Sequence, residues 1–181
     1  MPEGGIITGI AFRLDESIDQ PLSVVLPEIE IRISTTPRSV YDFSFIFAEN
    51  VGPDETIVFT RGPARLEPST SPEVPRPFSQ FIPLNKPFEY DPRKGGLAVD
   101  LLNFQLPTGT PGSLLIDAAG TGTVALAGSV GIEVAHFALA GLIIELQFTP
   151  IPEPAALSLL GVGGIILLLE NTFRRKEEHK A

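Results

Sequence analysis

The sequence has no cysteine and no tryptophan, and its 181 residues include only two histidines and one methionine. Without cysteine, the chain can form neither a disulfide framework nor a thiolate metal site. Without tryptophan, it lacks the aromatic side chain best suited to stacking on sugar rings. With so little histidine, catalytic sets and metal-ligand sets have few residues to draw on. We therefore expect a protein that is not an enzyme and that carries no metal or cofactor.

Positive charge is also scarce, because 13 lysines and arginines face 22 acidic residues and give a formal net charge of -9. Basic residues are scattered along the chain, apart from a cluster near its C-terminal end. A chain of this charge repels nucleic-acid phosphates. Nucleic acid is therefore not an expected partner.

The first residues lack the positively charged start and the apolar stretch of a secretory signal peptide. Apolar positions Ile7, Ile10, Phe12 and Leu14 instead indicate a strand that begins with almost no lead-in. We expect Met1 to be an internal start, with a further segment upstream of it in the gene.

Short apolar runs separated by turn clusters predict an all-β fold for residues 1–148, an antiparallel two-sheet β-sandwich of jelly-roll-like form. In the clearest run, Ile29, Ile31 and Ile33 alternate with Glu28, Glu30, Arg32 and Ser34, which predicts a half-buried strand with its polar side chains in solvent. The proline-rich residues 65–77 are expected to form a loop. The runs that carry strand signals are 6–14, 22–34, 44–50, 56–62, 97–106, 113–120, 123–132 and 141–150.

Signals for catalysis are weak. His136 lies in an apolar run typical of a packed histidine, and His179 lies in the basic tail. The stretch around Ser129 resembles a nucleophile elbow but has Ala127 where the first glycine belongs. The carboxylates that leave open a hydrolytic pair or a calcium site are Asp15, Glu16, Asp54, Glu55, Asp91, Asp100 and Asp117.

Two groups of aromatic residues leave a carbohydrate-binding module open as an alternative function, and a glycan-active enzyme on the same sandwich as a weaker one. The simpler interpretation of these aromatics is core and loop packing. The residues are Tyr41, Phe43, Phe45 and Phe47, followed by Phe78, Phe81, Phe88 and Tyr90.

The C-terminal tail differs from everything before it. Residues 155–169 are apolar except for Ser158, and a helix of that length is too short to cross a bilayer. Extension to residue 173 makes the helix just long enough if Glu170 lies near the headgroups. Arg174, Arg175 and Lys176 follow at once, in a charged tail at 174–181. Such a cluster keeps its end in the cytoplasm and leaves the sandwich outside. The alternative is a buried core helix. It is a poor explanation, because this segment has no polar face.

Residues 149–154 link the sandwich to this helix. Pro152 and Pro154 fix their own φ angles and hold Glu153 extended, as suits a peptide read by a membrane enzyme.

The ordered trio of Pro152, Glu153 and Pro154, an apolar segment and a terminal basic cluster resembles the PEP-CTERM sorting signal. That resemblance implies recognition of these three residues by exosortase, a membrane sorting enzyme of Gram-negative bacteria that make exopolysaccharide. It implies a transient anchor at 155–173 and a stop-transfer cluster at 174–176. The chain departs from the pattern in having no signal peptide, in Glu170, and in Glu177 and Glu178 after the arginines.

Together these features predict a surface or extracellular protein. Its precursor sits in the inner membrane with the sandwich outside, is handed to exosortase, and is associated with exopolysaccharide or a biofilm matrix.

Overall fold

The computed structural model describes residues 4–15, 24–66, 73–105, 108–109, 118–127, 133–135 and 137–151. Within them the regular secondary structure is antiparallel β-structure, as predicted, apart from one short 3-10 helix. The chain divides into two units, residues 1–149 and 150–181. The strands are β1 (Gly5–Phe12), β2 (Val24–Thr36), β3 (Thr56–Leu66), β4 (Gln80–Tyr90), β5 (Gly96–Asn103), β6 (Thr108–Gly109), β7 (Ala118–Ala127), β8 (Phe137–Leu142) and β9 (Ile144–Pro150), with one 3-10 helix, η1 (Phe47–Asn50).

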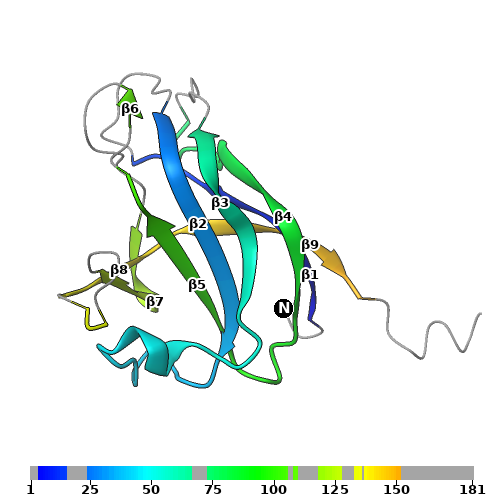
Figure 1. The fold of residues 1–181 in the computed structure, drawn as a ribbon, viewed down its shortest axis with the longest axis vertical. Coiled ribbons are helices and arrows are strands. Elements are labelled where there is room, and N and C mark those ends of the chain that lie inside the picture. The colour runs from blue at the N-terminus through cyan, green and yellow to red at the C-terminus, as the bar shows by residue number, and fades with distance from the viewer. Residues whose placement is uncertain are drawn as a thin grey trace, which may run out of the picture. The chain divides into compact units, whose positions relative to one another are not determined.

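The strands form two larger sheets and a hairpin (Figure 1). One larger sheet has the order β4-β1-β9, and the other has the order β3-β2-β5, with β6 pairing the far end of β2. β7 and β8 pair with each other. In Figure 1, β5, β2, β3 and β4 run side by side, and β9 passes behind β2 and β3.

A single apolar core lies between the two larger sheets. It joins β1 and β4 of one sheet to β2 and β3 of the other, and half-buried residues of β5 and β9 pack against it. Burying branched side chains on both inner faces is the main force that holds such layers together. The core residues without any solvent exposure are Ile7, Ile10, Ile29, Ile31, Ile33 and Val58.

The alternation in β2 was predicted correctly for its inner face only. Ile29, Ile31 and Ile33 are fully buried, but Glu30 and Ser34, expected in solvent, are only 8% and 3% exposed. Glu30 accepts a hydrogen bond from the Nε of Arg32 at 2.7 Å, and Ser34 accepts one from the amide of Gly52 at 3.2 Å. The outer face is thus covered by its own ion pairs and by the loop before β3.

Strand β4 was not predicted, because Pro83 and Pro87 lie inside it and proline interrupts a ladder. β4 tolerates them as an end strand, since β1 is the one described strand that pairs with it. The strand predicted at residues 44–50 is wrong. These residues form a loop with one isolated bridge, at Ile46, followed by η1. The expected break between the runs at 113–120 and 123–132 is also wrong, since β7 passes through it with a shift of register.

The two larger sheets approach each other closely on one side. β3 lies beside β4, and the amide of Thr60 donates a hydrogen bond to Oδ1 of Asn85 at 2.8 Å. On the other side the end strands are β5 and β9, beyond which these sheets have no further strand in the part of the chain that the structure describes. The sandwich is therefore closed at β3 and β4 and open at β5 and β9.

Within the ranges given above, the structure contains no helix long and apolar enough to span a bilayer. The predicted helix at 155–173 lies outside the described residues.

Candidate functional site

A groove of about 860 Å³ occupies the open side of the sandwich. One wall is β5, and the opposite wall comes from the end of β8 and the start of β9. The loop between β2 and β3 closes one end. Apolar side chains dominate the lining, including Phe12, Phe43, Leu97, Val99, Leu142 and Ile144. A concave, mostly apolar surface with a few polar groups is the usual form of a binding site.

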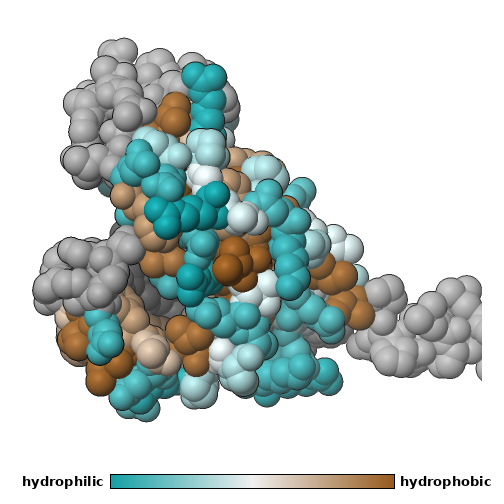
Figure 2. All heavy atoms as spheres, viewed as in Figure 1, coloured by the Kyte–Doolittle hydropathy of each residue, from teal (hydrophilic) through white to brown (hydrophobic). Residues whose placement is uncertain are grey.

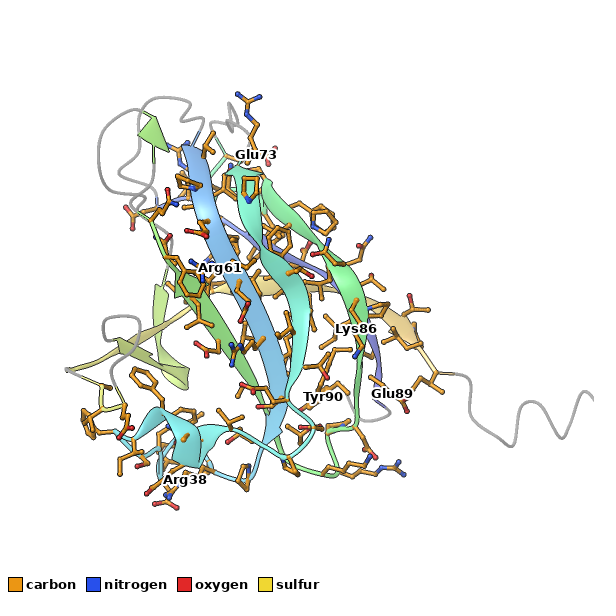
Figure 3. The ribbon with its side chains drawn as sticks, viewed as in Figure 1. Arg38, Arg61, Glu73, Lys86, Glu89 and Tyr90 are labelled. Atoms are coloured by element: carbon orange, nitrogen blue, oxygen red, sulfur yellow. The ribbon has the colours of Figure 1, made fainter. Side chains whose placement is uncertain are left out.

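The loop at residues 37–51 is held in place by two polar side chains. Asn50 is 4% exposed and exchanges hydrogen bonds with the backbone of Ser44, at 2.9 and 2.8 Å. Arg38 binds the carboxylate of Glu49 at 2.7 Å and the carbonyl oxygens of Glu49 and Asp42. Arg38 lies beside η1 in Figure 3. This loop is therefore preorganised before any ligand arrives.

Backbone pairing ties the same loop to the segment before β8. The amide of Phe47 donates to the carbonyl of Glu133 at 3.1 Å, and the amide of Ala135 donates to the carbonyl of Phe45 at 2.7 Å. Residues far apart in sequence thus meet behind the loop that closes one end of the groove, a contact that sequence patterns do not reveal.

A charged cluster lies on β2 and β5 at the rim of the groove. The guanidinium of Arg32 binds Glu30 at 2.7 Å and lies 3.7 Å from a carboxylate oxygen of Glu55. Arg32 is also the cross-strand partner of Asp100. Within the described part of the chain, no hydrogen bond or direct ion pair engages the Asp100 carboxylate.

Burial in the concave rim raises the pKa of Asp100, Arg32 lowers it, and Glu55 and Glu30 raise it again, for a net increase. Water still reaches this side chain, which is exposed by its surface area. A carboxyl with a raised pKa beside another carboxylate is the pattern that glycoside hydrolysis uses. Here the neighbouring carboxylates Glu30 and Glu55 are both paired with Arg32, as in a structural ion-pair network.

The aromatic residues considered for sugar stacking divide into two sets. Phe88 belongs to the core, Tyr90 donates a hydrogen bond to the carbonyl of Gly95 at 3.0 Å, and Arg13 lies over the Phe78 ring. In contrast, Tyr41 and Phe45 are 94% and 52% exposed. Figure 2 shows apolar residues gathered at the end of the molecule where η1 lies. Phe43 and Phe47, from the same loop, line the groove.

A second polar network fixes the segment after β5 to the outer face of its sheet. The Arg61 guanidinium stacks 3.8 Å from the centre of the Phe104 ring and binds Glu28 at 2.8 Å, and Glu28 also accepts a hydrogen bond from Gln105. These hydrogen bonds, that from Arg61 first, lower the pKa of Glu28. Arg61 lies over the middle of this face in Figure 3. The network has a structural role.

Asp54 anchors the loop before β3, and we expect it to make stability depend on pH. Burial alone would raise the pKa of Asp54, but hydrogen bonds from the hydroxyl and the amide of Thr35, at 2.6 and 2.7 Å, lower it overall. The contribution is therefore present above the unfolded pKa of about 3.9 and is lost as pH falls through the lower folded value. Asp54→Asn should flatten this part of the curve of unfolding free energy against pH, measured with urea between about pH 2 and 6.

The matched control is Glu89→Gln at an exposed position of β4, which leaves the bonds between Asp54 and Thr35 intact and should keep the acid limb that Asp54 produces. If the free energy of unfolding fell as steeply with decreasing pH in Asp54→Asn as in the parent, Asp54 would not be the source of this pH dependence.

Several predicted site residues lie outside the described residues, together with both histidines: Pro152, Glu153 and Pro154 of the predicted sorting motif, and the basic residues Arg174, Arg175 and Lys176. Asp91, one of the calcium candidates, is engaged by Arg93 through both carboxylate oxygens, which holds its pKa at about 2. Among the residues described, no group of three or more acidic or histidine side chains is placed to hold a metal ion.

Comparison of the chain with models of protein families, with curated proteins and with solved structures finds no match.

Proposed function

We propose that this chain is a non-enzymatic surface protein whose β-sandwich binds a partner through the groove and whose tail is a sorting signal read by exosortase. The observation that carries the sorting proposal is the order of the tail: a proline-framed Glu153, an apolar segment at 155–173, and a basic cluster at 174–176. Its support from the fold is that β9 ends at Pro150, where a second unit of the chain begins.

In this proposal residues 155–173 cross the inner membrane, with Arg174 to Lys176 in the cytoplasm and the sandwich outside. The precursor is then processed and the sandwich joins the cell surface or an exopolysaccharide matrix. The sandwich itself is proposed to be jelly-roll-like, a topology that needs strands beyond those described.

Glu153→Ala tests the sorting signal. Glu153 is the one charged residue of the motif that exosortase would recognise, and it lies between two prolines with fixed φ angles. Its loss removes a charge-assisted contact worth ~1.5 to 3 kcal/mol, about one to two powers of ten in recognition. In a strain that contains exosortase, we expect membrane-bound precursor to accumulate, measured by pulse-chase and by the intact mass of the released product.

Glu153→Asp should give a partial defect because its reach is shorter, and Glu89→Ala, on the exposed face of β4, should give none. Release of Glu153→Ala with the parent's kinetics and terminus would show that the motif is not read.

A carbohydrate-binding module is the second candidate function, favoured by one observation. Tyr41 and Phe45 present exposed rings next to a groove that Phe43 and Phe47 enter. Exposed rings beside polar groups suit the apolar faces of sugars. If this candidate is right, the full-length chain should be retained on an immobilised neutral polysaccharide.

A further inference from the structure

The groove runs along an end strand whose outward backbone groups can be identified. β2 and β5 keep one register from Ile29↔Asn103 to Thr36↔Gly96. The amide of Phe104 donates to the carbonyl of Glu28 at 2.9 Å, which continues that register as a hydrogen-bonded pair. Hydrogen-bonded and non-hydrogen-bonded pairs alternate along an antiparallel ladder. The N–H and C=O groups of Leu97, Val99 and Leu101 therefore point away from β2.

No strand in the described ranges pairs with that outward edge, because β5 ends the order β3-β2-β5. Natural end strands are usually guarded by proline, lysine, a bulge or a covering segment. β5 reads GLAVDLLN, with neither proline nor lysine, and its register with β2 is unbroken. Among the described residues, a row of donors and acceptors without a partner strand is thus left at the wall of an apolar groove.

The two faces of β5 present different chemistry beside this edge. Leu97 and Val99 pack against the core, and Leu101, 39% exposed, continues the same face into the groove. Asp100 projects from the opposite face, where no hydrogen bond or direct ion pair within the described residues engages its carboxylate. A strand lying along β5 would meet apolar side chains on one face and an acidic group on the other.

We propose that an extended segment of a partner polypeptide adds to β5 as a new strand, with apolar residues opposite Leu97, Val99 and Leu101 and a lysine or arginine opposite Asp100. The backbone edge selects an extended polypeptide, because only a main chain offers matching donors and acceptors along its length. The acidic group selects the basic residue by charge complementarity. This inference rests on the proposed role of the groove as a binding site and is independent of the sorting signal.

Two probe peptides of identical composition test the strand geometry. Each is an eight-residue, fluorescently labelled peptide of alternating lysine and valine, as long as β5 itself. One is N-methylated on three valines and the other on three lysines. When valines lie opposite Leu97, Val99 and Leu101, their amides face β5, and the lysine amides face away. N-methylation of valine therefore removes the bonds to β5, while N-methylation of lysine leaves them.

Binding is measured by fluorescence anisotropy on the full-length chain in mild detergent. We expect the lysine-methylated peptide to bind as the unmodified peptide does and the valine-methylated peptide to bind about tenfold more weakly or worse. Equal affinity for the two methylated peptides would show charge attraction alone and would overturn the proposal. Absence of saturable binding of the unmodified peptide up to about 1 mM would overturn it as well.

Asp100→Asn supplies a test from the side of the protein. It should lower the affinity for the valine–lysine peptide several-fold. It should not change the affinity for a peptide with serine in place of lysine, because only a basic residue is attracted to Asp100. Equal loss for both peptides would contradict the assignment of Asp100.

Other occupants give different results. If the chain forms a concentration-dependent dimer in sedimentation that the valine–lysine peptide dissociates, the occupant is a second copy. If a neutral oligosaccharide displaces the peptide, the groove is a glycan site. Either outcome overturns the assignment of the groove to a partner strand, whatever the result for Glu153.

Discussion

Replacement of Ile31 by alanine is expected to lower the free energy of unfolding by about 2 to 5 kcal/mol. Ile31 is fully buried in β2 between β3 and β5, at the centre of the core that joins the two larger sheets. The change removes buried methyl and methylene groups and leaves a cavity that a central strand, paired on both sides, cannot collapse to fill. Urea unfolding of the full-length chain, followed by circular dichroism, measures the loss.

Ile57→Ala is the matched control, since Ile57 lies on the adjacent strand β3 and is 45% exposed. It should lower the free energy of unfolding by ~1 kcal/mol or less, because much of this side chain stays in contact with water in the folded protein. Similar losses for the two variants would mean that the core does not lie where β2 and β3 place it.

Gly52→Ala is expected to cost about 1 to 3 kcal/mol or more, because the backbone leaves no room for a side chain. A Cβ on Gly52 would lie 1.8 Å from the carbonyl oxygen of Thr35, so the backbone itself must move. That movement also disturbs the hydrogen bond from the Gly52 amide to Ser34 and the nearby bonds of Asp54 to Thr35. The same urea measurement applies.

Gly62→Ala is the corresponding control on β3, where the nearest atom to an added Cβ is the Thr60 carbonyl oxygen at 3.6 Å. It should be neutral or stabilise by up to about 1 kcal/mol, through reduced freedom of the unfolded chain. If Gly52→Ala were as stable as Gly62→Ala, the close contact between the loop and β2 would be absent in solution.

The inner face of the sandwich was predictable because it follows a local rule. Ile29, Ile31 and Ile33 alternate with polar residues, and the structure buries all three. The outer face was not predictable, because Glu30 is buried with its partner Arg32, and Ser34 is buried under a loop 18 residues further along the chain. β4 was missed since the effect of Pro83 and Pro87 depends on whether a strand ends a sheet, and topology decides that.

The groove was less accessible to sequence reasoning than the tail. The sorting motif is contiguous and can be read from its letters, and it remains a prediction. The groove requires β5, the start of β9 and the loop after β2 to come together, and no short pattern records that meeting. Only the strand run at 97–106 was predicted, and it did not show that β5 would be an end strand.

The first strand of the chain has a consequence for how the protein folds. β1 lies between β4 and β9, and Thr8 donates a hydrogen bond to the side chain of Gln147, 139 positions along the chain. Its sheet therefore cannot be completed until nearly the whole sandwich sequence has emerged from the ribosome or from a translocation pore. Contacts of such long sequence separation slow folding, because a large loop must close before any contact stabilises it. In the export proposed above, the chain would therefore cross the membrane as an unfolded polypeptide, before β9 can pair with β1.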